Sequence, residues 1–319
     1  MSTPLRTLFA VLGVAIAACT SAQDRPVRIL VGFSPGGTSD VIARFIADPM
    51  RIALGVPVIV ENRPGADGVL AAEALKNAAP DGKTLMISPI TVTVFAPLTH
   101  TKLRYDPIKD FAPVSLAANF QLALAVGSGS PAKTLQEYIA WVRANPAKAT
   151  FGTPTIGGPP HFFGLMLARA AGVDLAPVPY KGGAPLVNDL IGGQVPAGIT
   201  VLSEMIKYHE SGKVRILGSS GSQRSPAAPN VPTFKELGLA EMEGMGWQAF
   251  HATARTSRPT IDRLSGVIAS AIKAPEVTER LLALGLEPVG STPDELARGV
   301  AEDTARWAPV VKASGFRAD

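Results

Sequence analysis

The chain has 319 residues, enough to bury a large core and to form about two domains. It carries 30 Lys and Arg against 26 Asp and Glu, and because the basic residues are scattered rather than clustered, the charge argues against a nucleic-acid-binding surface. The 46% of hydrophobic residues and the mean hydropathy of +0.22 exclude a disordered chain.

The N-terminus has the pattern of an export signal. Arg6 precedes an apolar run at residues 8–18 that is too short to span a bilayer comfortably, and small residues follow it. Two processing routes fit this pattern. Cleavage after Ala22, which we favour, would release a soluble protein, whereas "IAAC" resembles a lipobox that would leave a lipid on Cys19. Cys19 is the only cysteine, so we expect an exported protein that folds without disulfides.

After the signal, short β-rich runs alternate with helical patterns. Helices are predicted at residues 39–50, 69–79, 135–144 and 161–171, with further helices near the C-terminus. Strands are predicted at residues 27–33, 83–90, 121–127, 149–154, 175–180, 213–220 and 246–254, and residues 56–68 run from a strand into a turn. This alternation predicts an α/β protein with parallel sheets, whose ligands bind beyond the carboxyl ends of the strands.

The turn after the first strand, "VGFSPGG", matches the Gly-x-Ser-x-Gly nucleophile elbow of serine hydrolases at residues 32–36. In such an enzyme the residue after the nucleophile supplies a backbone N–H to the oxyanion hole, but here that residue is Pro35, which has none. The chain has four histidines, and nothing in the sequence places one of them beside Ser34. We therefore interpret this turn as non-catalytic.

The same turn is suited to holding an anion. Backbone N–H groups at the start of the next helix can point at a carboxylate or phosphate, and glycines allow close approach; the residues concerned are Gly36, Gly37, Thr38 and Ser39. A plain turn capped by Thr38 or Ser39 is the alternative. A second loop rich in hydroxyls and glycine, at residues 153–158, also leads from a strand into a helix. Two such loops, one in each α/β unit, can face each other across a cleft.

Six segments together resemble the extracytoplasmic solute receptors of the tripartite tricarboxylate transporter family, the Bug receptors. They are "VGFSPGGTSDVIAR", "VENRPGADGVLAAEALKNAAPDGKTLMI", "LRYDPIKDFAPVSLAA", "FGTPTIGGPPHF", "VPYKGGAPLVNDLIGGQV" and "RSPAAPNVPTFKELG". The resemblance covers nearly all of the chain after the signal. It implies a two-domain periplasmic-binding-protein fold (type II), with parallel-rich sheets joined by two crossover strands and a ligand cleft between the domains.

The resemblance also implies how the chain is divided and what it binds. Residues 1–22 are the signal peptide, residues 23–122 and 222–319 form domain 1, and residues 123–221 form domain 2. The ligand is a small carboxylate and the partners are the permease subunits of a tripartite tricarboxylate-type transporter. No enzymatic activity, cofactor, metal or nucleic acid is implied, and the location is periplasmic. Because no heptad seam is visible, we expect a monomer.

Carried onto this chain, the resemblance assigns ligand binding to both domains. In domain 1 the assigned residues are Ser34, Pro35, Gly36, Gly37, Thr38, Ser39, Ser88 and Thr91. In domain 2 they are Thr153, Thr155, Gly157, Gly158, His161, Tyr180, Lys181, Gly182 and Thr200.

Two positions depart from the family's pattern. Gly158 stands where a hydroxyl is common, and residues 198–201 offer no charge at a strand end where many relatives carry an acid or amide. The second departure favours a plain carboxylate over an amino acid as ligand. Three functions remain open at this point: a receptor that feeds a permease, a receptor that signals to a sensor partner, and a secreted hydrolase that uses Ser34.

Overall fold

The computed structural model describes residues 25–318, so the export signal with Cys19 and Ala22 lies outside the described residues. The first group of strands begins with three that are parallel to one another, β1 (Val27–Val31), β2 (Val58–Asn62) and β3 (Thr84–Pro89). β9 (Met245–Thr253) pairs antiparallel with β3, and the short β10 (Leu286–Pro288) pairs with the long strand described below. We call the part of the protein built on these strands the first lobe.

The second group of strands is smaller. β5 (Thr150–Thr153) and β6 (Ala176–Pro179) are parallel, and β7 (Gly198–Val201) continues the sheet beside β5. β8 (Val214–Ser219) follows later in the chain. We call the part built on these strands the second lobe.

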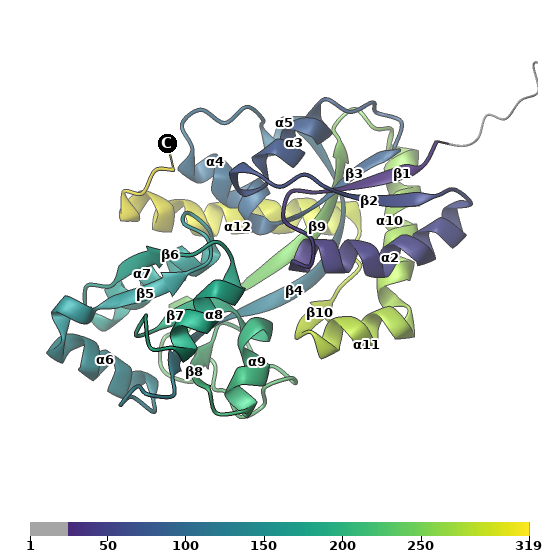
Figure 1. Ribbon diagram of the computed structural model, residues 1–319. Coiled ribbons are helices and arrows are strands. Elements are labelled where there is room, and N and C mark those ends of the chain that lie inside the picture. The colour runs from purple at the N-terminus through teal and green to yellow at the C-terminus, as the bar shows by residue number, and fades with distance from the viewer. Residues whose placement is uncertain (1–24, 319) are drawn as a thin grey trace, which may run out of the picture.

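One long strand, β4 (Phe111–Gly127), belongs to both lobes and joins them (Figure 1). From Phe111 to Gln121 it pairs antiparallel with β9, and from Leu122 to Gly127 it pairs antiparallel with β7 and β8. The strand order is therefore β2-β1-β3-β9-β4-β7-β5-β6, with β8 and β10 also paired to β4. β9 lies in the sheet that contains β1.

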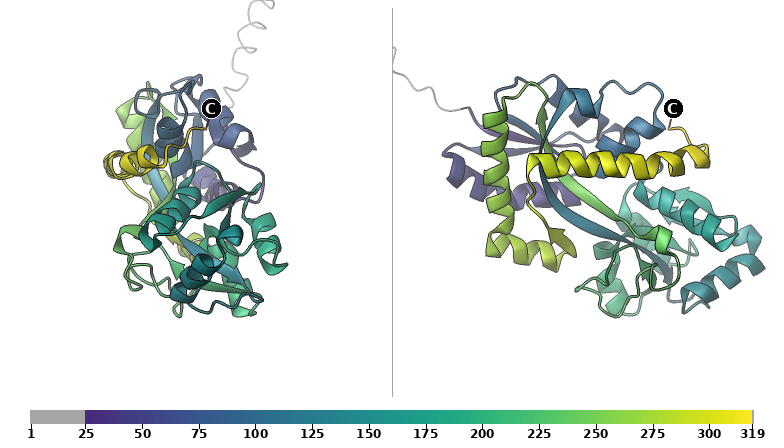
Figure 2. Two further views of the ribbon diagram at one scale, coloured as in Figure 1. Left: turned by 90° about the vertical axis from the view of Figure 1, so that its left-hand side faces the viewer. Right: turned by 180° about the vertical axis from the view of Figure 1, so that it is seen from behind.

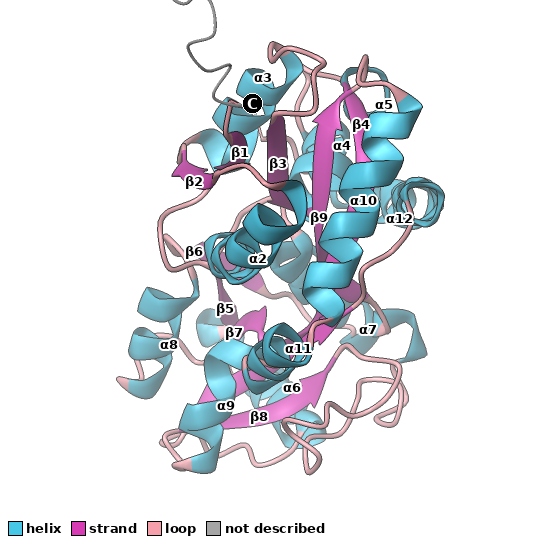
Figure 3. Cartoon of the chain, turned by 90° about the vertical axis from the view of Figure 1, so that its right-hand side faces the viewer, coloured by secondary structure: helices cyan, strands magenta, loops and turns pink. Residues whose placement is uncertain are grey.

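Helices surround the strands of each lobe (Figure 3). Those of the first lobe are α2 (Thr38–Leu54), α3 (Val69–Lys76), α4 (Ala96–Thr99), α5 (Pro107–Asp110), α10 (Arg258–Lys273) and α11 (Pro275–Ala283). Those of the second lobe are α6 (Leu135–Ala144), α7 (Pro159–Ala171), α8 (Gly183–Ile191) and α9 (Leu202–Glu210). Short helical turns are η2 (Ala66–Gly68), η3 (Thr91–Phe95), η4 (Pro146–Lys148) and η5 (Ala240–Met242), and the last helix is α12 (Pro293–Ser314). No helix within residues 25–318 is long and apolar enough to cross a membrane.

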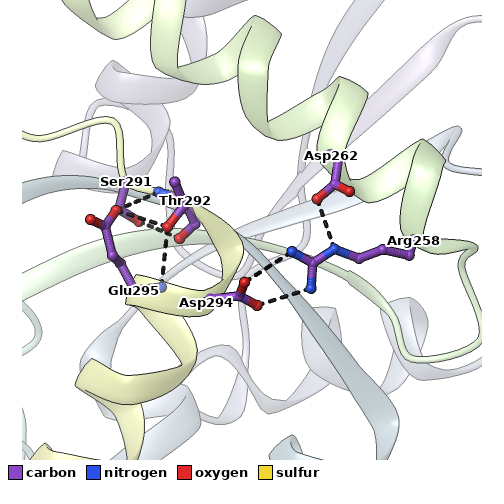
Figure 4. Close-up of polar contacts among 6 residues, drawn as sticks. All are labelled: Arg258, Asp262, Ser291, Thr292, Asp294 and Glu295. Atoms are coloured by element: carbon purple, nitrogen blue, oxygen red, sulfur yellow. Dashed lines mark hydrogen bonds and ion pairs between the residues drawn. The ribbon is translucent and has the colours of Figure 1, made fainter.

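The last helix, α12, packs on both lobes, against β4 and η3 of the first and α7 of the second (Figure 2). Its start is held by a capping box, in which the Thr292 hydroxyl accepts from the Glu295 N–H and the Glu295 carboxylate accepts from the Thr292 N–H. Arg258 of α10 also binds both oxygens of Asp294, at 2.9 and 3.0 Å, and contacts Asp262 (Figure 4). These contacts fix the first turn of α12 to the first lobe, while its other end reaches the second.

Candidate functional site

The turn between β1 and α2 is locked by its own hydrogen bonds. The Gly37 N–H donates to the Ser34 carbonyl at 3.3 Å, and the Gly36 N–H donates to Asp40 Oδ2 at 2.9 Å. Gly36 has a φ of +83°, a left-handed conformation that glycine adopts without strain. Within α2 the Val41 N–H is the first to bond back, to the Gly37 carbonyl. The N–H groups of residues 38–40, in the first turn, therefore have no acceptor within the helix and can donate to another group.

The buried carboxylate of Asp40 holds this turn in place. It accepts hydrogen bonds from Gly36, from Arg44 Nε at 2.9 Å and from Asn62 Nδ2 at 2.9 Å. Burial raises the pKa of Asp40, but the hydrogen bonds from Arg44, Gly36 and Asn62 outweigh it, and the pKa is lowered overall. Asp40 is therefore a structural anion of the first turn. The alternative of a cap by Thr38 or Ser39 does not apply, since Gly37 is the N-cap of α2 and has no side chain to bond the helix.

Other predicted residues of the first lobe lie at the end of β3. The buried Ser39 hydroxyl donates to Gln248 Oε1 of β9 at 2.7 Å, which directs it toward the sheet. The Ser88 hydroxyl is buried and has no hydrogen-bond partner within residues 25–318. Thr91 begins η3 directly after β3. Ser88 thus keeps an unused hydroxyl near the end of a parallel strand, where such folds bind ligands.

The second predicted loop, between β5 and α7, is also held internally. The Gly157 N–H donates to His161 Nδ1 at 3.2 Å, and the Thr153 hydroxyl donates to the Thr155 carbonyl at 3.1 Å. A methyl group added at Gly158 would lie 3.5 Å from Thr91 Oγ1. The second-lobe loop therefore comes close to the first lobe near Thr91.

Gly157 faces the C-terminal tail. It has a φ of +79°, and a methyl group added there would lie 2.8 Å from Phe316 Cε1. A larger residue at this position would therefore collide with the Phe316 ring. Together with the use of its N–H by His161, this makes Gly157 a packing position as well as a predicted binding residue.

His161 is buried among aromatic rings. Its ring centroid lies 5.0 Å from that of Phe162 and 5.0 Å from that of Phe316. Burial lowers the pKa of His161 from 6.5 to about 4. The neutral ring can accept the Gly157 N–H, so His161 supports the loop in its uncharged form.

The pH dependence of stability follows from two buried histidines. Burial also lowers the pKa of His251 in β9 to about 4. Between pH 6.5 and 4 these two histidines are protonated in the unfolded chain but neutral in the folded protein. Their contribution to the free energy of unfolding is therefore fully present above about pH 6.5 and decreases as the pH falls toward 4. The loss is up to about 1.4 kcal/mol per pH unit for each histidine. Chemical denaturation at several pH values should show this slope.

The variant His161→Gln provides the comparison, because glutamine can still accept the Gly157 N–H and does not titrate. We expect its stability to fall less steeply with pH than that of the wild type, whatever its absolute stability. Equal slopes for the two proteins would show that folding does not lower the pKa of His161.

The turn between β6 and α8 carries three predicted residues. The Tyr180 hydroxyl donates to Asp189 Oδ2 at 3.0 Å, Lys181 is exposed, and Gly182 is the N-cap of α8 with a φ of +103°. Behind this turn, the buried Thr200 hydroxyl at the end of β7 donates to the carboxylate of Glu204. Glu204 is in the first turn of α9 and was not foreseen from the sequence.

A cavity of about 880 Å³ lies between the lobes. Gly36 of the β1–α2 turn lines it from the first lobe, together with residues 282–287 at the end of α11 and the start of β10. From the second lobe it is lined by Ala184 and Val187 of α8 and by Ser203, Glu204, Ile206, Lys207, Tyr208 and Glu210 of α9. Residues 225–227, which follow β8, complete the lining. Its size is in the range of small-molecule sites. The cavity thus connects the start of α2 with the starts of α8 and α9.

The histidines are engaged away from Ser34. His161 bonds Gly157, His100 Nδ1 lies 3.2 Å from the Ala96 carbonyl, and His209 Nδ1 accepts from the Ile216 N–H at 3.3 Å. His251 lies in β9 with its ring 6.2 Å from that of Phe111. Within residues 25–318 no hydrogen bond joins Ser34 to a histidine, and no group of three or more His, Cys, Asp or Glu could hold a metal ion.

Two α/β lobes joined by a shared strand, with a cavity between them, define the class of periplasmic binding proteins. The chain belongs to the tripartite tricarboxylate transporter receptor family, because the sequence profile described as "Tripartite tricarboxylate transporter family receptor" matches residues 42–316. Receptors of this family are periplasmic and bind solutes. The protein is accordingly a solute-binding receptor and not an enzyme, and Ser34 is not a nucleophile.

Similar proteins cover almost the whole chain. Protein BugT of Bordetella pertussis is 34% identical over 319 residues, which cover 97% of this chain and 98% of BugT. MatC from Rhodopseudomonas palustris, solved with bound malate, is 32% identical with a TM-score of 0.81, and the match covers 90% of this chain and 99% of MatC. Another R. palustris protein, solved with adipate, is 29% identical with a TM-score of 0.86, and the match covers 93% of this chain and 99% of that protein.

The structure brings together only some of the predicted residues. Gly36 lines the cavity, and Gly158 lies beside Thr91 across the boundary between the lobes. Ser39, His161 and Tyr180 have side-chain partners inside their own lobes or in the tail. Sequence reasoning missed Glu204, Gln248 and Phe316, because each acts through a contact that the local sequence does not reveal.

Proposed function

We propose that the protein captures a small carboxylate between its lobes and presents it to the permease of a tripartite tricarboxylate-type transporter. The observation that carries this proposal is the start of α2, where the N–H groups of residues 38–40 are left without helical partners beside a turn that lines the cavity. The carboxylates named with two similar structures, malate and adipate, support the same class of ligand.

We propose that residues of both lobes bind the ligand. On the first lobe we assign this binding to the N–H groups of Thr38 and Ser39, with the hydroxyl of Ser34 and the unpartnered hydroxyl of Ser88. On the second lobe the proposed contacts are Thr153, Thr155, Gly158, Tyr180, Lys181, Gly182 and Thr200. Backbone donors at a helix start favour an anion through both hydrogen bonding and the helix dipole.

Ligand capture is proposed to close the cleft. We assign residues 23–122 and 222–319 to one moving domain and residues 123–221 to the other, with β4 and the return to β9 as the two crossings. A ligand that touches both domains binds the closed form more tightly than the open form, and this difference in affinity drives closure. We propose that the receptor works as a monomer and that the mature chain begins after Ala22, with lipidation at Cys19 as the other route.

A ligand panel tests the proposal. Purified protein is unfolded to remove bound ligand, refolded, and heated with mono-, di- and tricarboxylates and with amino acids. A ligand at about 100 times its Kd adds about 2.7 kcal/mol of stability, which should raise the Tm by several degrees. Isothermal titration then gives the Kd of each compound that shifts the Tm. If no carboxylate shifts the Tm, the proposed function is wrong.

Uptake separates transport from signalling. A deletion strain should lose uptake of the best ligand from the panel and regain it with the intact gene. Normal uptake in the deletion strain, with a lost transcriptional response to the same ligand, would instead assign the protein to a sensor.

A further inference from the structure

The sequence analysis found no charge at residues 198–201, but the structure places a carboxylate there from the next turn of the chain. Glu204 lies in the first turn of α9, and the Thr200 hydroxyl donates to its Oε2 atom across the junction of β7 and α9. The same carboxylate packs against Gly183, the first residue of α8, so closely that a methyl group at Gly183 would overlap it. Glu204 thus lies at the N-terminal ends of two helices, α8 and α9, where a negative charge is favoured.

Glu204 has no cationic partner in the described part of the chain. No Lys, Arg or His among residues 25–318 forms an ion pair with it. Lys207 lies one turn further along α9, but its Nζ atom is over the Tyr208 ring, 4.8 Å from the ring centroid. Burial raises the pKa of Glu204, and the hydrogen bond from Thr200 offsets this only in part, so the pKa is raised overall. The Glu204 side chain is half-buried, so its carboxylate is only partly solvated, and an ammonium group of a ligand would stabilise it.

The carboxylate lines the cavity in which the ligand is proposed to bind. Gly36 of the β1–α2 turn and Glu204 line the same space. The other charged side chains that line it are Glu210, Glu287 and Lys207, and Glu287 accepts a hydrogen bond from Gln121 Nε2 at 3.2 Å. Three carboxylates against one ammonium group give the lining of the cavity a net negative charge.

We propose that Glu204 determines ligand specificity by selecting a carboxylate that also carries an ammonium group and by disfavouring a second free carboxylate at its end of the cavity. This inference rests on the proposed function and names the substrate class of the same site. The ligand's carboxylate binds the start of α2, its ammonium group faces Glu204, and the apolar side chains of Ala184, Val187 and Leu284 contact the carbon chain between them. The expected ligand is therefore zwitterionic, contrary to the sequence expectation of a plain carboxylate.

Matched ligands test the inference on the mature receptor. The first pair is 6-aminohexanoate and adipate, and the second is 4-aminobutanoate and succinate; within each pair the chains have equal numbers of carbons and differ in one terminal charge. In the wild type the amino compound of at least one pair should bind about tenfold or more tightly than its dicarboxylate. In Glu204→Gln the affinity for the amino compound should fall about tenfold and that for the dicarboxylate should rise.

Two further variants complete the design. Glu210→Gln removes a carboxylate from the same helix and the same cavity without touching Thr200 or Gly183, so it should change the ratio of the two affinities much less than Glu204→Gln does. Gly183→Ala should displace the Glu204 carboxylate and change the ratio in the same direction as Glu204→Gln.

The outcomes separate this inference from the proposed function. If the wild type binds carboxylates but Glu204→Gln and Gly183→Ala leave the ratio unchanged, or if the wild type prefers the dicarboxylate in both pairs, Glu204 does not select the ligand and only this inference fails. If the wild type binds no carboxylate of the wider panel, the proposed function fails and the inference with it.

Discussion

Replacing Gly37 with valine should abolish ligand binding and leave the protein folded. Gly37 is the N-cap of α2 with a φ of −75°, which any residue can adopt, and a methyl group there would lie 3.4 Å from the Ser34 carbonyl oxygen, an ordinary contact. A branched side chain at this N-cap would block the ligand carboxylate from the N–H groups of Thr38 and Ser39, which we propose bind it. We expect the affinity to fall at least about 100-fold, with stability changed by no more than about 1 kcal/mol.

Gly129 supplies the matched control for this variant. It is an exposed loop glycine in the second lobe with nothing within 4 Å of an added methyl group, so Gly129→Val should bind ligand normally. Ser34→Ala removes one hydrogen bond and should weaken binding by about 1 kcal/mol. Titration calorimetry and thermal unfolding of the three variants give both quantities. Normal binding by Gly37→Val would show that the α2 start does not hold the ligand.

Gly157 is not an equivalent test, although the sequence suggested the same role for both loops. Its N–H already donates to His161, and a side chain there would strike Phe316. Loss of binding in a Gly157 variant would therefore mix a change in the loop with a change in the tail. Gly37 has neither complication, because its nearest neighbour is the carbonyl of its own turn.

The alternation of strands and helices was predictable because it depends on local sequence. The predicted helix at residues 135–144 is α6, and the strand predicted at residues 83–90 contains β3. The long β4 was predicted only at residues 121–127, of which residues 122–127 pair within the second lobe. Its first half contains Pro113 and has register shifts against β9, so its pairing depends on strands from elsewhere in the chain rather than on a regular local pattern.

The two turns of the site were found from their glycines and hydroxyls, but the contacts that hold them were not. Asp40 and His161 each accept an N–H from a glycine four residues earlier, which reduces the donors left for a ligand. Glu204 was missed because the search ended at the last residue of β7, whereas its carboxylate returns to Thr200 from one helical turn later. A polar residue four positions after a strand-end hydroxyl is a signal that could have found it.

Aromatic side chains from four segments meet at the boundary between the lobes. Phe95 at the end of η3 stacks on Phe162 of α7, with centroids 5.5 Å apart and planes 16° apart, and its ring centroid lies 5.0 Å from that of Trp307 in α12. Phe316 in the tail lies at an edge of Phe162, 6.1 Å away. Phe95 is fully buried in a core cluster that includes side chains of both lobes. This residue therefore couples the first lobe to α7 of the second.

Phe95→Ala should lower the free energy of unfolding by about 3 to 5 kcal/mol, because it removes a buried ring and leaves a cavity that its neighbours fill only partly. Phe111→Ala is the matched control: Phe111 is also buried, but its ring partners, Tyr105 and His251, lie in the first lobe. Both variants should lower the Tm by similar amounts. The ratio of the amide exchange rate in α7 to that in β1 should be larger in Phe95→Ala than in the wild type, since α7 has lost its contact with the first lobe. In Phe111→Ala this ratio should not change. Equal acceleration of α7 in both variants would contradict the assignment, because it would mean that α7 is held by its own lobe and that the aromatic contact only adds to the general stability of the core.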